Sequence, residues 1–124
     1  MEFQSNSLNK TIIIAEIGVN HNGSIKKALE LIDIAYDCGV DIVKFQTFKA
    51  ENVATKDAPK ASYQLKVTSR KESQLNMLKK LELKKEDYPI LLQKCNDLGI
   101  GFMSTPYDID DAKFLVSLGV KKLK

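Results

Sequence analysis

The sequence predicts an α/β fold in which short buried strands alternate with amphipathic helices and build a parallel sheet. Two observations lead to this prediction. Short apolar runs alternate with longer segments whose apolar residues recur at helical spacing. Each of three helical segments also ends at a glycine, which is followed at once by an apolar run; the three are Gly39, Gly99 and Gly119. A glycine in this position readily takes the left-handed conformation that ends a helix.

The predicted elements can be justified in order along the chain. The near-continuous apolar run TIIIAEIG at 11–18 reads as a first strand buried on both faces. The helix after it has Leu29, Ile32, Ala35 and Tyr36 at helical spacing, and Asn22 or Ser24 begins it. The next two helices begin at the turn 85–87 and at Asp108, by the same reasoning. The predicted order is strand 11–17, helix 24–38, strand 41–47, helix 86–98, strand 100–105, helix 109–118 and strand 120–124.

Residues 49–84 interrupt this alternation with a long polar insertion, and a loop of that length in a compact domain usually has a function. We predict one helix in it, over 71–81, whose leucines face the core; they are Leu75, Leu78 and Leu81. Three further side chains of the insertion could reach over the carboxyl ends of the predicted strands, although the sequence does not place them: Tyr63, Arg70 and Met77.

The expected domain organisation is a polar segment at 1–10 followed by a partial barrel domain at 11–124. A (β/α)8, or TIM, barrel needs roughly 250 residues. Four parallel strands ending at an uncapped Lys124 would leave an apolar edge exposed. We therefore expect the N-terminal part of a TIM barrel, about half of one, with about four parallel strands and the helices between them.

Composition excludes several classes of protein. The 124 residues are 44% hydrophobic and 28% charged, which is typical of a globular domain. No apolar run approaches the length of a transmembrane helix, so no membrane partner is expected. The net charge is only +3 and its basic residues are scattered, which argues against nucleic acid as a partner. Cys38 and Cys95 stand alone, each as a small buried filler, and predict a reduced, cytoplasmic chain.

Polar side chains occur where the predicted strands end. Ligands of parallel α/β folds bind at this carboxyl edge. Lys44, Ser104 and Lys124 each follow their helix-ending glycine by five residues, which predicts that they lie at one height. Lys44 and Gln46 share a face because side chains alternate along a strand. Lysines and hydroxyls converging on one edge indicate an anion site, for phosphate or carboxylate. The candidate residues are Glu16, Lys44, Gln46, Ser104, Thr105 and Lys124.

Structural roles remain open for these residues. Lys44 and Lys124 can extend buried stems to solvent, and Glu16 can simply pair with Lys44. The glycine- and asparagine-containing loop 18–23 reads as a tight turn before a helix, and it matches no nucleotide-binding motif. The single histidine, His21, lies in this loop with no partner at metal-ligand spacing. It is expected to be hydrogen-bonded within the loop, although a substrate contact stays possible.

Four segments of the chain resemble the N-acetylneuraminate (sialic acid) synthase family. The resemblance runs from Ile12 to Lys124, and the combination of AEIGVNHNG with VKFQTF and STP is specific. The family includes enzymes that make legionaminic, pseudaminic and spore-coat sugar acids. The segments are IIIAEIGVNHNG at 12–23, DIVKFQTFKAENVATKDAPKA at 41–61, ESQLNMLKKLEL at 72–83 and GFMSTPYD at 101–108.

The resemblance implies a transferase of carbohydrate biosynthesis. The reaction would join phosphoenolpyruvate, N-acetylmannosamine or a related 2-acetamido sugar, and water, giving a nine-carbon 2-keto sugar acid and phosphate. By motif match, Lys44 and Lys124 would hold phosphoenolpyruvate, and Thr105, with Ser104, would join its phosphate site. Gln46 would lie by the sugar, and Glu16 near the acceptor end of the reacting centre.

The resemblance also implies parts that these 124 residues do not supply. A divalent metal, Mn²⁺ or Mg²⁺, would polarise the sugar aldehyde. It would be held by two histidines outside this chain, so no metal ligand is assigned within it. Full-length members carry a small antifreeze-protein-like domain that completes the partner's site in a domain-swapped homodimer. We therefore expect the 124-residue chain to be inactive by itself.

Two kinds of alternative remain. Keto-deoxy-octulosonate and deoxy-heptulosonate phosphate synthases also place lysines at strand ends, but their phosphorylated acceptors need extra arginines, and Arg70 is the only arginine here. A non-catalytic barrel fragment that acts as a binding module is the alternative from another class. It predicts that the polar residues at the strand ends are lost, and they are present.

Overall fold

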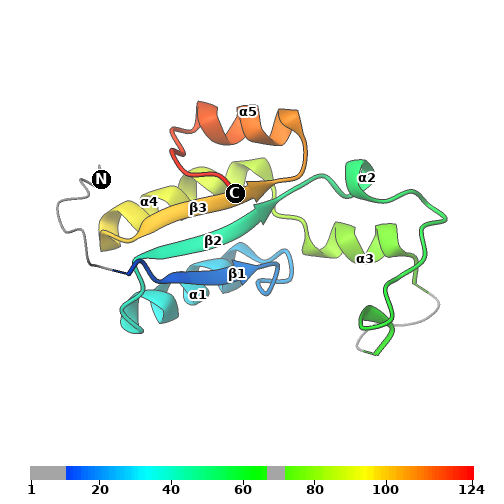
Figure 1. The fold of residues 1–124 in the computed structure, drawn as a ribbon, viewed down its shortest axis with the longest axis horizontal. Helices are drawn as coiled ribbons and strands as arrows, with labels where there is room; N and C mark the ends of the chain where they lie inside the picture. Colours follow the sequence, from blue (N-terminus) through cyan, green and yellow to red (C-terminus); the bar gives the residue numbers. More distant parts are fainter. Residues whose placement is uncertain (1–10, 67–71) are drawn as a thin grey trace.

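The structure is a computed structural model and describes residues 11–66 and 72–124. Three strands form one parallel sheet in the order β1-β2-β3 (Figure 1). The elements are β1 (Ile14–Gly18), α1 (Ile25–Asp37), β2 (Ile42–Thr47), α2 (Ala50–Val53), η1 (Gln64–Lys66), α3 (Gln74–Leu81), η2 (Lys85–Asp87), α4 (Tyr88–Leu98), β3 (Gly101–Pro106) and α5 (Ile109–Ser117). The predicted alternation of strands and helices is confirmed. The polar segment 1–10 lies outside the described residues.

The helix boundaries follow from the residues that begin and end each helix. The hydroxyl of Ser24 accepts a hydrogen bond from a backbone N–H in the first turn of α1, and the carboxylate of Asp108 does the same for α5. Gly39, Gly99 and Gly119 have φ angles of 73°, 70° and 82°. The left-handed glycines predicted at the three helix ends are therefore confirmed.

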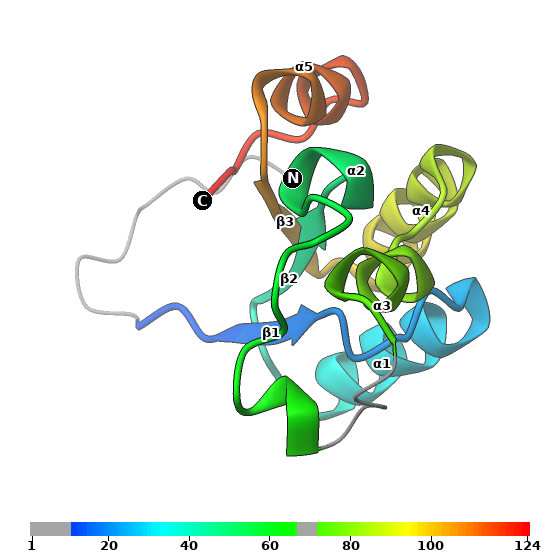
Figure 2. The same cartoon turned by 90° about the vertical axis from the view of Figure 1, so that its right-hand side faces the viewer.

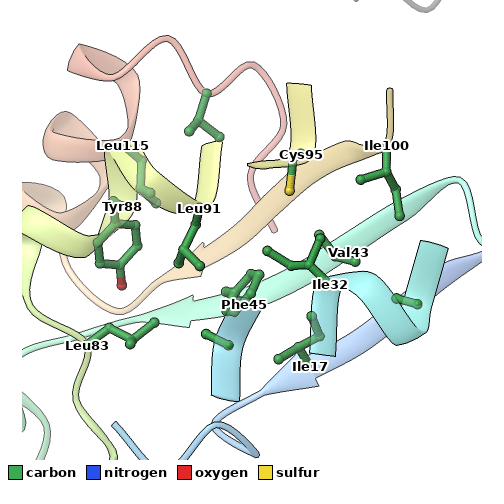
Figure 3. Packing of buried hydrophobic residues seen from close by; sticks show 13 residues of the cluster. Ile17, Ile32, Val43, Phe45, Leu83, Tyr88, Leu91, Cys95, Ile100 and Leu115 are labelled. Atoms are coloured by element: carbon green, nitrogen blue, oxygen red, sulfur yellow. The ribbon is translucent and has the colours of Figure 1, made fainter. Parts of the chain in front are cut away.

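The core lies between one face of the sheet and two helices. Helices α1 and α4 cover the same side of the sheet (Figure 2). Val43 and Phe45 of β2 project into this layer and meet Ile32 of α1 and Leu91 of α4, all four fully buried (Figure 3). Burying one such side chain stabilises the fold by about 1.5–3 kcal/mol. This packing holds the carboxyl ends of the strands in place.

The structure corrects the two outer strands. Strand β1 begins at Ile14 rather than at residue 11, because the carbonyl of Ile13 accepts hydrogen bonds from the N–H groups of Asp41 and Ile42 before regular pairing starts. The run is also not buried on both faces, since Ile14 is 44% exposed. Residues 120–124 form no strand. This lysine-rich segment pairs with β3 only through an isolated bridge between Leu123 and Ser104.

The expectation that both cysteines are buried is wrong for Cys38 and confirmed for Cys95. Cys38, the C-cap of α1, and Tyr36, in its last turn, are both exposed at the end of the helix. Cys95 is buried, and burial raises the pKa of its thiol to about 12, so it behaves as an apolar filler.

The insertion lies beyond the carboxyl ends of the strands, where α2 and α3 pack together (Figure 1). Glu82 attaches the end of this segment to the end of β2: its carboxylate accepts a hydrogen bond from the backbone N–H of Ala50 at 3.0 Å and pairs with Lys49. The predicted helix begins at Gln74 rather than at 71, with Ser73 as its N-cap, and Lys71 lies outside the described residues. None of the helices in the described ranges has the length and apolar character needed to cross a membrane.

Candidate functional site

The strand register brings most of the predicted site residues to one face of the sheet. Lys44 and Gln46 alternate with the buried residues of β2, so their side chains lie on the face away from α1 and α4. Glu16 is the register partner of Lys44 on β1, and Thr105 is the partner of Gln46 on β3. The expectation that Lys44 and Gln46 share a face is confirmed.

Lys44 and Glu16 form an ion pair at this face. Nζ of Lys44 lies 2.5 Å from Oε2 of Glu16, with the lysine side chain 15% exposed and the glutamate side chain 49% exposed. The predicted structural pairing of these two residues is therefore present. A lysine this far removed from solvent attracts an anion more strongly than a fully hydrated one. The pair thus offers a largely desolvated cation beside an accessible carboxylate.

Ser104 does not join this group, which corrects the expectation of one common height. In the register, Lys44 lies level with Met103, and Ser104 lies level with Phe45 on the opposite, helix-facing side. Ser104 is fully buried there, with its Oγ 2.7 Å from Oγ1 of Thr47. The equal spacing misled because β2 begins three residues after its glycine and β3 only two.

Lys124 is brought to the same edge by the bridge after α5. Leu123 lies level with Ser104, and the backbone N–H of Lys124 donates to the carbonyl of Ser104 at 3.1 Å. This bond brings the backbone of Lys124 to the end of β3, close to Thr105 in the chain. The register therefore positions four of the six predicted residues on one face at the carboxyl edge, in two successive levels, and Lys124 lies at the same edge.

The loop between β1 and α1 closes one side of this edge. Its backbone turns through left-handed conformations at Gly18, Asn22 and Gly23, as glycine and asparagine readily do. The missing side chain of Gly18 matters here: a Cβ atom would lie 3.3 Å from Oε1 of Glu16 and 3.5 Å from Nε2 of Gln46. Gly18 thus lets these two side chains approach each other over the strand end.

His21 is part of the loop's internal structure, as predicted. It is 1% exposed, its ring stacks on Phe45 at a centroid distance of 6.0 Å, and its Nδ1 accepts a hydrogen bond from the N–H of Gly23 at 3.0 Å. Burial lowers the pKa of His21, and the carbonyl of Gly18 acts in the opposite direction. The ring is therefore a neutral acceptor that fixes the turn.

A cleft of about 730 Å³ lies between the strand ends and the insertion, and of the predicted site residues it is Gln46 that lines it. Pockets of 300–1,000 Å³ are typical of small-molecule sites. Tyr63 and Met77 line it, whereas Arg70 lies outside the described residues. Leu78 and Leu81 also line it, so only Leu75 of the predicted core stripe is buried. The complete lining is Val19, Asn20, Asn22, Gln46, Phe48, Val53, Tyr63, Gln64, Gln74, Met77, Leu78, Leu81 and Tyr107.

Tyr107 is a site residue that the sequence reasoning missed. Its hydroxyl donates a hydrogen bond of 3.1 Å to Oε1 of Gln46, and its ring packs against Phe48 at a centroid distance of 5.5 Å. Tyr107 comes one residue after the end of β3. An aromatic residue at that position, directly behind the polar strand end, is the signal that could have found it.

The described residues do not fit the divalent metal that the family resemblance implies. Within residues 11–66 and 72–124, no three histidine, cysteine or carboxylate side chains come together in an arrangement that could hold a metal ion. His21 is turned into the core, where its Nδ1 is already used. No chemical step is therefore assigned to a metal here.

The fold and the site define a parallel α/β domain with charged and amide side chains beside a cleft at the carboxyl edge of its sheet. The chain belongs to the NeuB family, which matches residues 31–124. It is 49% identical to an N,N'-diacetyllegionaminic acid synthase of Campylobacter jejuni over 94% of its own length, and 51% identical to that of Legionella pneumophila over 90%. The chain spans about a third of the length of these relatives, 35% and 32%.

Solved structures agree with this assignment. An N-acetylneuraminic acid (sialic acid) synthetase from Leptospira borgpetersenii, in complex with citrate, matches with a TM-score of 0.74 and 30% sequence identity. The match covers 93% of this chain and 35% of that one. The predicted fold class, an N-terminal part of a family barrel, is confirmed, with three strands in the described residues instead of about four.

Proposed function

We propose that the full-length protein is a sugar-acid synthase that condenses phosphoenolpyruvate with an acetamido sugar and water. The single observation that carries the proposal is the shared face of Glu16, Lys44, Gln46 and Thr105, from which Gln46 reaches a cleft of about 730 Å³. Family membership supports it, because NeuB relatives are named as legionaminic, spore-coat and neuraminate synthases or biosynthesis proteins.

The proposed roles of the residues follow from their charge and position. Lys44 and Lys124 bind the carboxylate and phosphate of phosphoenolpyruvate, and Thr105 donates a hydrogen bond to the phosphate. C3 of phosphoenolpyruvate forms a bond to the aldehyde carbon of the sugar, whose oxygen takes up a proton, and positive charge develops at C2. Water adds at C2 with loss of a proton and phosphate leaves, while the two cations hold the carboxylate and phosphate groups. Ser104 holds its strand end from behind and makes no substrate contact in this proposal, because its hydroxyl is buried against Thr47.

Glu16 and Gln46 serve the acceptor in this proposal. Glu16 stays paired with Lys44 until the anionic substrate binds. Its exposed carboxylate then accepts a proton from a hydroxyl group of the sugar. Gln46 donates to a sugar oxygen. The divalent metal is proposed to be bound by residues outside this chain, and the domain-swapped dimer likewise involves surfaces outside it.

A diacetamido sugar is the favoured acceptor. The two legionaminic acid synthases are about half identical to this chain, whereas the neuraminate-9-phosphate synthases of mouse and human are 33% and 32% identical. The cleft also suits two acetamido groups. It combines the carboxamides of Asn20, Asn22 and Gln74, which can pair with amides, with an apolar wall around Met77 and Leu78 that can receive methyl groups.

Phosphate release from phosphoenolpyruvate by the full-length protein tests both statements. N-acetylmannosamine, a 2,4-diacetamido sugar or no sugar is supplied, each with and without Mn²⁺. The proposal expects sugar-dependent release and a product mass equal to phosphoenolpyruvate plus sugar plus water minus phosphoric acid. Faster turnover of the diacetamido sugar supports the favoured acceptor, and faster turnover of N-acetylmannosamine contradicts it. No release with either sugar moves the binding-module alternative to the front.

A further inference from the structure

Tyr107 occupies a fixed position above the end of β2. Its backbone N–H donates to the carbonyl of Thr47 at 3.0 Å, which continues the pairing of β2 and β3. Its ring packs at an interplanar angle of 57° against Phe48, which is 7% exposed and therefore a firm support. Backbone and ring together hold the hydroxyl 3.1 Å from Oε1 of Gln46.

This contact fixes the orientation of the carboxamide group of Gln46. A carboxamide has an acceptor end and a donor end, and the Tyr107 hydroxyl occupies the acceptor end. The donor end, Nε2, lies on the side of Gly18, 3.5 Å from where a Cβ atom would be. Among the described residues, the hydrogen bonds found for Gln46 use its oxygen atoms, and none uses Nε2. The amide protons therefore remain available for a bound molecule.

Gln46 and Tyr107 both line the cleft, and Tyr107 is 49% exposed there. We propose that Tyr107 is a positioning residue for acceptor recognition: it holds the amide of Gln46 so that Nε2 donates to an oxygen atom of the acetamido sugar. The inference rests on the proposed function for the identity of the bound sugar. The orientation of Gln46 itself rests only on the contacts of this chain.

The hydroxyl and the ring of Tyr107 have different roles in this proposal, and one substitution distinguishes them. Tyr107→Phe keeps the packing on Phe48 and removes only the bond to Gln46. In the full-length enzyme we expect this variant to raise KM for the acceptor sugar about three- to tenfold, the value of one ordinary hydrogen bond. KM for phosphoenolpyruvate and kcat are expected to stay within about twofold. The acceptor is whichever of N-acetylmannosamine and the 2,4-diacetamido sugar is turned over faster.

Two comparisons show whether the effect passes through Gln46. Tyr36→Phe removes a phenol hydroxyl from the exposed surface of α1, outside the cleft lining, and is expected to leave acceptor KM within about twofold. In a Gln46→Ala background, adding Tyr107→Phe is expected to change acceptor KM by less than about twofold, because the partner of the hydroxyl is already gone. Independent, multiplying effects of the two substitutions overturn the inference, as does an unchanged acceptor KM in Tyr107→Phe.

A second measurement does not depend on turnover. Crystal structures of the full-length wild type and Tyr107→Phe are compared at the Gln46 amide, with thermal melting to confirm that the variant folds. The inference expects a single amide orientation in the wild type and a rotated or divided one in the variant. An identical orientation in both overturns it. If neither sugar is turned over, the proposed function fails, and this comparison still decides the role of Tyr107.

Discussion

Lys44 has two possible roles, as a cation for phosphoenolpyruvate and as the counter-ion of Glu16, and one substitution separates them. Lys44→Met keeps the length of the side chain and removes its charge. A charge-assisted hydrogen bond contributes about 1.5–3 kcal/mol, so we expect KM for phosphoenolpyruvate to rise roughly 10- to 150-fold in the full-length protein. Steady-state kinetics with phosphoenolpyruvate as the varied substrate measure this.

The control for this substitution is Lys121→Met, at an exposed lysine beside the amino ends of β2 and β3, which is the opposite edge of the sheet. It is expected to leave the kinetics unchanged. If Lys44 serves only as the partner of Glu16, Lys44→Met shifts the melting temperature and leaves KM for phosphoenolpyruvate where it was. That outcome removes Lys44 from the proposed anion site.

His21 gives a prediction about pH. Its pKa is lowered in the folded protein by burial, so the unfolded chain binds more protons once the pH falls below about 6.5, the ordinary histidine value. The free energy of unfolding is therefore expected to decrease as the pH falls from about 7 to 5. Protonation of Nδ1 also breaks the hydrogen bond from Gly23.

Denaturant unfolding across this pH range, in wild type and His21→Asn, measures the effect. Asparagine keeps an acceptor near the position of Nδ1 and cannot titrate, so its unfolding free energy should depend less on pH in this window. Equal pH dependence in the two proteins is evidence that His21 does not contribute.

The residue types of the site could be predicted from the sequence, but the face of the sheet on which each side chain lies could be predicted only in part. Lys44 and Gln46 were placed on one face because alternation within a strand is a local rule. Ser104 was placed wrongly because its height depends on the register between β2 and β3, which the number of residues after a glycine does not fix. The role of Tyr107 depends on a contact with Gln46, 61 residues away in the sequence.

At the level of elements, the loop between β1 and α1 is joined to the end of α3 through Gly23. A Cβ atom at Gly23 would lie 2.4 Å from the carbonyl oxygen of Lys80, which is closer than atoms can approach. Gly23→Ala must therefore push the loop and the insertion apart. Since φ is +71° here, alanine adds backbone strain to the clash.

Gly39→Ala is a matched control, because Gly39 has a φ of +73° and nothing lies within 4 Å of its Cβ position. Strain alone costs about 1–2 kcal/mol. Gly23→Ala is expected to lose about 1–3 kcal/mol more, the usual cost of overpacking. Denaturant unfolding of both variants measures the difference. If the two variants lose the same amount, the loop and α3 are not held together at this point.

The helices with clear sequence signals at their ends were predicted to within one or two residues. Ser24 and Asp108 begin α1 and α5, and left-handed glycines follow their last turns. The segment 120–124 shows the limit of such local reasoning. Its apolar start resembles a strand, but strand formation requires consecutive paired residues, and only Leu123 finds a partner in β3.

At the scale of the whole molecule, one face of the sheet packs against helices and the other is only partly covered. Helices α1 and α4 cover the first face, where Ile17 of β1 is buried. Ile14 lies on the other face of β1 and remains 44% exposed. Its register partner Ile42 is already buried, at 2%. The relatives are about three times as long as this chain, so we expect the rest of the full-length protein to pack on this face.

Ile14→Ser in the full-length protein tests this expectation. If Ile14 becomes buried there, serine loses its transfer free energy and lowers the free energy of unfolding by about 2 kcal/mol. Ile109→Ser is the control, because Ile109 is 74% exposed on the outer surface of α5 and its replacement should stay within about 0.5 kcal/mol. Two equally small losses would mean that this face stays open to solvent. A large loss at Ile14 alone would mean that Glu16, Lys44 and Gln46, on the same face, point into an enclosed and weakly hydrated interior. Their charges would then act on a substrate far more strongly than at a surface.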